Sequence, residues 1–112
     1  VIHNLLTNSL DAFDALPAAR HPSRRIEITA QARGSDVLVA VEDSGPGISA
    51  SVAARLFEPF VTSKVSGMGL GLSISRSFLR SQGGDLQVER GQLGGARFVI
   101  HLATTDTGQT AL

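Results

Sequence analysis

The stretch "IEITAQARGSDVLVAVED", residues 26–43, decides the fold class. Its first half alternates apolar with polar side chains, which predicts a half-buried strand over residues 26–33 with its isoleucines facing a core. The letters "GSD" predict a turn, because glycine and aspartate favour tight changes of direction. Residues 37–43 are apolar on both faces, which is typical of a central strand. The stretch therefore predicts a β-hairpin inside a larger sheet.

Helical and strand patterns continue on both sides of this hairpin. Residues 1–16 have helical periodicity, with an apolar side formed by Ile2, Leu6, Leu10 and Phe13. After the hairpin, the sequence predicts a short helix over residues 52–56, capped by Ser49 or Ser51, and a long helix over residues 70–82 that ends at Gly83-Gly84. A second hairpin follows, with strands over residues 85–90 and 96–102. This order predicts an α+β two-layer sandwich, with helices on one face of a mixed, mostly antiparallel sheet.

The composition indicates one compact domain. The chain has 112 residues, of which 42% are hydrophobic. Ten basic residues balance ten acidic residues, so we expect no nucleic-acid partner. No apolar run approaches the roughly 20 residues of a membrane span. The absence of cysteine excludes disulfides and agrees with a cytoplasmic protein.

The two ends of the sequence differ from its middle. Val1 already lies inside a helical pattern, so we expect the chain to be a fragment of a longer protein. Residues 104–112 are mostly polar and predict a flexible C-terminal tail. Residues 1–103 are then the expected domain.

A polar stripe runs along the first predicted helix. Asn4, Asn8 and Asp11 are spaced i, i+4 and i+7, so they share a face that points away from the apolar side. One interpretation is a solvated helix face. The other is a ligand site, because asparagine is a poor helix former and two amide oxygens one turn apart suit a hard cation such as Mg²⁺. The stripe alone leaves both interpretations open.

The segment "VEDSGPGIS", residues 41–49, places Asp43 at the end of the central strand and before a turn with Gly45 and Gly47. A dinucleotide-binding fingerprint is disfavoured, because a proline separates the glycines and no strand ends in an acidic residue about 20 positions on. A carboxylate beside a turn where the backbone comes close suits a flat, amino-bearing ring such as adenine. The alternative is an aspartate that only shapes its own turn.

A second glycine-rich segment, "SGMGLGLSIS", residues 66–75, opens the long predicted helix with Gly67, Gly69 and Gly71. A helix start has unpaired N–H groups and a partial positive charge, so it attracts anions. Glycines lack the Cβ atoms that would keep bulky phosphates away from these groups. No P-loop sequence is present. The segment therefore predicts a different kind of polyphosphate cradle.

Four sequence boxes together resemble a known family. "NLLTNSLDA", "DSGPGI", "LFEPFVTSK" and "GMGLGLSIS" are similar, in this order, to the N box, first glycine box, F box and second glycine box of sensor histidine kinases. "GGARFVIHL" resembles the closing strand of their ATP-binding domain. The resemblance is greatest to the nitrogen-regulation and dicarboxylate-sensing branch. It implies a Bergerat-type fold in which a strand expected before the first helix is missing here, so that the sheet has an unpaired edge or pairs with another chain.

The resemblance implies roles for the residues in the boxes. Asn8 would coordinate Mg²⁺ and serve as a catalytic residue, and Asn4 would assist at the phosphates or in the metal shell. Asp43 would bind the adenine amine. The residues implied to contact the nucleotide are Asn4, Asn8, Asp43, Gly45, Gly47, Ile48, Phe60, Lys64, Gly67, Gly69, Leu70, Gly71 and Leu72.

The segment between the two glycine boxes would form a flexible lid. Lys64 would lie near the phosphates as a second catalytic residue. Phe57 and Phe60 would anchor the lid and pack against the partner domain, and core packing is the alternative for both.

Two positions depart from the family pattern. Ala96 stands where members often carry a threonine that supports the adenine-binding aspartate, so we expect weaker support of Asp43. Asp11 stands where members often carry lysine, and its negative charge favours a structural or metal-shell role over phosphate contact.

The resemblance favours a kinase over an ATPase. ATPases of the wider superfamily place a glutamate one helical turn before the metal-binding asparagine, as the base that activates water. Here that position is Asn4, and an amide cannot take a proton at neutral pH. His3, His21 and His101 lack the adjacent acid expected of a phosphoacceptor.

We therefore expect the chain to bind Mg-ATP and donate the γ-phosphoryl group to a histidine on an upstream dimerisation domain. The implied partners are that domain and a response regulator receiver domain, and the parent is expected to be a homodimer. Its catalytic part would be cytoplasmic, with or without an anchor in the inner membrane. The alternatives are a stand-alone ATPase and a docking module that binds no nucleotide.

Overall fold

The computed structural model describes residues 1–14, 24–58 and 71–103, without side chains for residues 11–14. Their elements follow the predicted order, with only small shifts at the ends. They are α1 (Ile2–Asp14), β1 (Ile26–Arg33), β2 (Asp36–Asp43), α2 (Ala50–Ala53), α3 (Gly71–Ser81), β3 (Asp85–Arg90) and β4 (Ala96–Ala103). The predicted tail, residues 104–112, lies outside the described residues.

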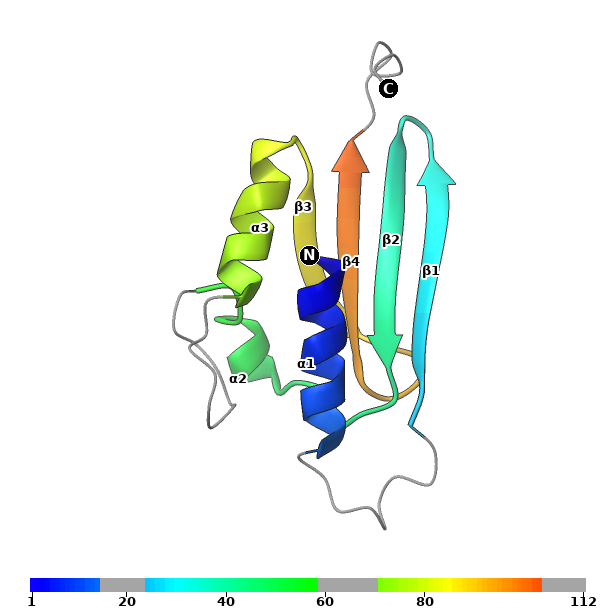
Figure 1. The fold of residues 1–112 in the computed structure, drawn as a ribbon, viewed down its shortest axis with the longest axis vertical. Helices are drawn as coiled ribbons and strands as arrows, with labels where there is room; N and C mark the ends of the chain where they lie inside the picture. Colours follow the sequence, from blue (N-terminus) through cyan, green and yellow to red (C-terminus); the bar gives the residue numbers. More distant parts are fainter. Residues whose placement is uncertain (15–23, 59–70, 104–112) are drawn as a thin grey trace.

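The four strands form one sheet with the order β1-β2-β4-β3 (Figure 1). Every pairing between these strands is antiparallel. The predicted hairpins are both present, and they join through β2 and β4, so β2 is a central strand as its apolar sequence indicates. The register pairs Val41 with Ile28 on one side and with Phe98 on the other.

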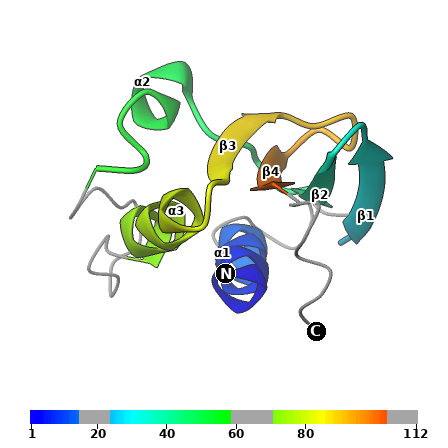
Figure 2. The same ribbon diagram turned by 90° about the horizontal axis from the view of Figure 1, so that it is seen from above.

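Two helices cover the same face of this sheet. α1 contacts β2, α3 contacts β3 and β4, and the two helices contact each other. Figure 2 shows them side by side beneath the strands. In the core between the layers, Leu5, Val41 and Leu86 are completely buried. The predicted α+β two-layer sandwich is confirmed.

The first strand is less buried than its alternation predicts. From Ile28 to Arg33 every residue of β1 is exposed, and the Ile28 side chain keeps 50% of its accessible surface. Ile28 does point to the helix side, because it is paired with the buried Val41. However, β1 is an edge strand, and the two helices contact the strands beyond it. The prediction of a half-buried strand was therefore wrong for most of β1.

The buried side of α1 also differs from the predicted one. Leu5 and Ser9, one helical turn apart, are 0% and 2% exposed. Ile2 and Leu10, assigned above to the apolar face, are 40% and 56% exposed. The innermost line of the helix therefore carries a leucine and a serine, and the serine hydroxyl has a buried partner on β2.

The helix ends follow local rules. Ser49 caps α2 and accepts a hydrogen bond from the Val52 amide at 3.4 Å. α3 ends where Gly83 adopts a φ of +84°, and the Gly84 amide donates back to the Leu79 carbonyl at 2.8 Å. None of the helices among the described residues is long and apolar enough to cross a membrane.

Candidate functional site

The carboxylate of Asp43 is the centre of the candidate site. It lies at the end of β2 and is 3% exposed. The Gly45 and Ala96 amides donate to its Oδ1 at 2.9 and 3.3 Å, and the Ser9 hydroxyl donates to its Oδ2 at 2.9 Å. The adjacent turn and two segments distant in sequence therefore fix one buried carboxylate.

Two glycine turns meet beside this carboxylate. Gly47 has a φ of +79°, and a Cβ at that position would lie 3.6 Å from the Gly94 carbonyl oxygen. The Gly95 amide donates to the Asp43 carbonyl at 3.1 Å, and a Cβ on Gly95 would overlap Asp43 Oδ1. Glycine is required at residue 95 by this close approach of two backbones. The turn after β2 and the turn before β4 thus form one rigid corner.

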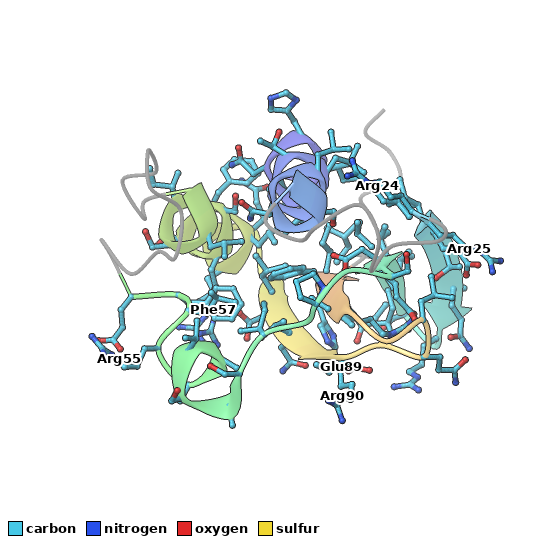
Figure 3. All side chains as sticks on the ribbon, turned by 90° about the horizontal axis from the view of Figure 1, so that it is seen from below. Arg24, Arg25, Arg55, Phe57, Glu89 and Arg90 are labelled. Carbon is cyan, nitrogen blue, oxygen red and sulfur yellow. The ribbon has the colours of Figure 1, made fainter. Side chains whose placement is uncertain are left out.

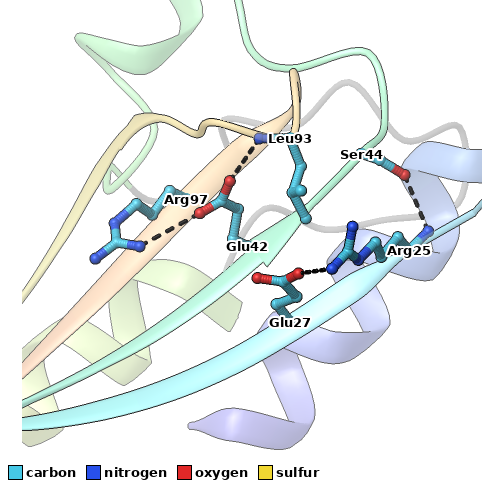
Figure 4. A network of polar contacts seen from close by, with 6 residues as sticks. All are labelled: Arg25, Glu27, Glu42, Ser44, Leu93 and Arg97. Atoms are coloured by element: carbon cyan, nitrogen blue, oxygen red, sulfur yellow. Dashed lines mark hydrogen bonds and ion pairs between the residues drawn. The ribbon is translucent and has the colours of Figure 1, made fainter.

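Glu42 fixes the same β3–β4 turn from the neighbouring position of β2. Its Oε2 accepts the Leu93 amide at 2.7 Å, and its Oε1 lies 3.3 Å from Nη1 of Arg97 (Figure 4). The side chain is nearly buried, and a Cβ on Gly91 would lie only 2.7 Å from it. Arg97 also pairs with Glu89 on β3 at 3.3 Å. Glu42 and Asp43, which are adjacent on β2, therefore both hold the β3–β4 turn.

The start of β1 is tied to the end of β2. The Arg25 amide donates to the Ser44 hydroxyl at 2.9 Å, and the Ser44 amide donates to the Arg25 carbonyl at 3.0 Å. The Arg25 side chain forms an ion pair with Glu27 (Figure 4). These bonds fix the direction in which the chain leaves Asp43.

A second part of the site lies where α1 meets the start of α3. The Nδ2 of Asn4 donates to the hydroxyl of the buried Ser75 at 3.1 Å. A Cβ on Gly71 would lie 3.8 Å from the Asn4 amide group, so the N box and the end of the second glycine box are neighbours. Asn4 and Asn8 are both half-buried rather than fully solvated. The face of α1 that carries the asparagines therefore borders α3 at Asn4 instead of facing only water.

Phe57, which follows α2, lies beside α3 (Figure 3). It is partly buried against the core, and the guanidinium of Arg76 lies 4.7 Å from its ring centroid. Arg76 and Arg80 also donate to Oδ1 of Asp85, at 2.9 and 3.1 Å. The hydrogen bond from Arg76 is the main reason that the pKa of Asp85 lies well below its usual range. Core packing is thus present for Phe57, whatever its contact with another domain.

The structure brings only some of the predicted site residues together. Asp43, Gly45, Gly47 and Ile48 form one corner, while Asn4, Gly71 and Leu72 lie at the contact of α1 with α3. Asn8 lies on α1, one helical turn after Asn4. The remaining predicted contacts lie outside the described residues: Phe60, Lys64, Gly67, Gly69 and Leu70. The side chain of Asp11 is also outside them.

The sequence interpretation missed Ser9, Glu42 and Gly95. Ser9 carried one weak signal, because it lies one helical turn after Leu5 in the sequence. Gly95 carried another, since it is the second of two glycines directly before a strand. Nothing in the sequence predicts that both residues reach Asp43.

Comparisons with known proteins place these residues in a family context. A family described as "Histidine kinase-, DNA gyrase B-, and HSP90-like ATPase" matches residues 1–106. The C4-dicarboxylate transport sensor protein DctB of Pseudomonas aeruginosa is 38% identical over 100% of this chain and 18% of that protein. The nitrogen regulation protein NtrY of Azorhizobium caulinodans is 33% identical over 76% of this chain and 11% of that protein. The chain thus spans less than a fifth of the length of these relatives.

Solved structures give the same picture. The catalytic domain of histidine kinase ThkA is 32% identical and superposes with a TM-score of 0.74, over 91% of this chain and 62% of that chain. Full-length ShkA in complex with AMPPNP is 30% identical, with a TM-score of 0.66 over 93% of this chain and 22% of that chain.

Proposed function

The chain belongs to the histidine kinase-, DNA gyrase B- and HSP90-like ATPases, as the four boxes predict, and from this we propose that it binds Mg-ATP for transfer of the γ-phosphoryl group to a protein histidine. The observation that carries the proposal is the buried Asp43 carboxylate, which neutral donors hold between two glycine turns. Residues 1–103 would form this ATP-binding catalytic domain.

The adenine ring would bind at Asp43. Backbone amides take up Oδ1, whereas Oδ2 accepts one hydroxyl and, as a carboxylate oxygen, has room for a second donor. The 6-amino group of adenine is such a donor. Gly45, Gly47 and Ile48 would line the ring, because this turn packs closely against the last hairpin.

The triphosphate and the metal would lie toward α1 and the start of α3. Asn8 offers an amide oxygen, a ligand type that suits Mg²⁺, and Asn4 and Gly71 are already neighbours there. When bound, the metal ion would supply charge neutralisation at the phosphates. Further contacts would come from Leu72 and from the segment outside the described residues, through Phe60, Lys64, Gly67, Gly69 and Leu70.

The chain is suited to transfer rather than hydrolysis. Its residue one turn before Asn8 is Asn4, whose amide donates to Ser75 and cannot serve as a base toward water. Catalysis by this chain would then consist of positioning the γ-phosphoryl group and stabilising its charge. The acceptor would be a histidine on an upstream dimerisation domain, and a response regulator receiver domain would take the phosphoryl group next.

The larger assembly follows from this proposal. Because the phosphoacceptor domain is a dimerisation domain, the parent protein would be a homodimer. With this nucleotide and this receiver domain, the catalytic part would be cytoplasmic, and the parent protein would lie there with or without an anchor in the inner membrane. Full-length ShkA, which was solved with AMPPNP, supports the use of an adenine nucleotide in this fold.

The test is a calorimetric titration of the chain with ATP, with and without Mg²⁺, followed by assays of phosphate release and of γ-phosphoryl transfer to a separately supplied histidine-bearing domain. We expect Mg²⁺-dependent binding, transfer to the added domain and negligible phosphate release. Rapid phosphate release without an acceptor would identify an ATPase instead. Absence of nucleotide binding would identify a docking module and overturn the proposal.

A further inference from the structure

We infer that Ser9 is a positioning residue for adenine recognition, because its hydroxyl orients the Asp43 carboxylate toward the 6-amino group. The inference rests on the proposed ATP site and adds a residue to it. Ser9 itself would not touch the nucleotide.

The position of Ser9 is unusual for a serine. It lies on the innermost line of α1, 2% exposed, one turn after the fully buried Leu5. Serine is not a strong helix former, and a buried hydroxyl is costly unless it is hydrogen-bonded. Its bond goes not to its own helix but to Asp43 Oδ2 at 2.9 Å, across 34 residues of sequence. The serine therefore connects the helix layer to the end of β2.

The other contacts of the carboxylate show what this bond contributes. The Gly45 and Ala96 amides both donate to Oδ1, so they fix one oxygen atom. The plane of the carboxylate also depends on where Oδ2 lies, and Ser9 donates to that atom. Since a carboxylate oxygen can accept more than one hydrogen bond, Ser9 orients Oδ2 without using up its capacity for a ligand amine.

Ser9 also revises the expectation based on Ala96. Ala96 is buried in the core next to Asp43, and its methyl group cannot donate a hydrogen bond. A threonine hydroxyl, often present at this position in the family, is thus absent. The structure contains a hydroxyl donor to the same carboxylate, on the helix instead of the strand. Support of Asp43 is relocated to α1 rather than weakened.

The experiment compares two ligands in the whole 112-residue chain. ATP carries the 6-amino group, and purine riboside 5′-triphosphate lacks it. We expect Ser9→Ala to weaken ATP binding about threefold to tenfold, in the range of one net hydrogen bond, and to leave binding of the purine riboside triphosphate unchanged. Ser77→Ala, on the exposed side of α3, is the matched control and should alter neither affinity.

Ser9→Cys provides a second variant of similar volume with a weaker donor, so its ATP affinity should lie between the other two. It carries the test if Ser9→Ala fails to fold. Equal losses for both ligands would indicate a merely structural serine and overturn the inference. If the unsubstituted chain binds ATP and Ser9→Ala binds it equally well, the inference alone is overturned. If the unsubstituted chain binds neither ligand, the proposed function is overturned as well.

Discussion

Two aspartates of the sheet are held in opposite ways. Asp43, at the end of β2, is buried and receives its described hydrogen bonds from backbone amides and a serine hydroxyl, which are neutral. Asp85, at the start of β3, keeps 28% of its side-chain surface and receives two arginine side chains and the Leu86 amide on one oxygen. The same type of side chain is therefore held by neutral groups in one place and by cations in the other.

Under the proposed function, the difference shows how a carboxylate that binds a ligand is distinguished from a structural one. Arginines neutralise Asp85 and join α3 to β3, so its charge is used within the fold. The described donors to Asp43 are neutral and supply no counter-charge, which agrees with the proposal that this carboxylate accepts a further donor from a ligand. Burial or acidity alone would not have distinguished the two residues.

The largest expected effect comes from Asp43→Asn. The new amide keeps an oxygen for the Gly45 and Ala96 amides, but it presents an NH₂ group where adenine also presents a donor. Loss of a hydrogen bond to a charged group costs about 1.5–3 kcal/mol, so we expect ATP affinity to fall about tenfold to a hundredfold in calorimetry. Asp85→Asn is the same chemical change and should leave ATP affinity as in the parent. Equal losses in both variants would erase the proposed distinction.

The next largest effect is expected for Gly95→Ala. The added methyl group would overlap Asp43 Oδ1 and crowd the Gly45 amide, so the corner must deform. Overpacking of this kind costs roughly 1–3 kcal/mol of unfolding free energy. Urea denaturation should show this loss, together with weaker ATP binding. As a control, Gly34→Asn changes another glycine, which has open space around it and a φ of +59° that asparagine tolerates, and should be nearly neutral.

Asp85→Asn should lower the stability of the fold and change how this stability depends on pH. Because the pKa of Asp85 is lowered in the folded chain, its ionised form stabilises the fold above the ordinary aspartate pKa of about 3.9, and this contribution is lost as the pH falls below it. We expect a loss of about 1–2 kcal/mol at pH 7. Urea denaturation of parent and variant should differ fully above about pH 5 and converge in stronger acid. A constant difference down to pH 2 would contradict this assignment.

The smallest effect is expected for Glu42→Gln. The amide oxygen can still accept the Leu93 amide, and only the ion pair with the partly exposed Arg97 is lost. A change below about 1 kcal/mol in thermal or urea denaturation follows, with ATP affinity unaltered. Glu42→Ala removes the acceptor as well and should cost more. Equal losses in the two variants would mean that charge, not the Leu93 bond, holds the turn.

Local patterns predicted most of the fold, and long-range register explains what they missed. The alternation of β1 correctly put Ile28 on the helix side, but no local pattern tells whether a helix lies over that strand. For α1, counting apolar residues favoured Ile2 and Leu10 over Ser9, because the pattern treats every hydroxyl as solvent-facing. Its partner lies on another strand, and only the fold reveals it.

The candidate site was predictable to a similar extent. Asp43 was singled out by its place between a central strand and a glycine turn, and the structure buries it there, while its role toward adenine stays a prediction. Asn4 and Gly71 could be joined only through the family resemblance, and the structure places them side by side. Glu42 and Gly95 depend on how the last hairpin pairs with β2, which a single sequence does not specify.

The two hairpin turns lie at opposite ends of the sheet (Figure 1). The Gly34 turn is separated from Asp43 by the length of β2, roughly 23 Å at about 3.3 Å per residue, and no heavy atom lies within 4 Å of a Cβ built there. The Gly34 turn is therefore a suitable attachment site. A dye, an affinity tag or an inserted reporter protein attached at this turn would leave the corner around Asp43 undisturbed, so the chain could be immobilised or imaged with the candidate site facing outward.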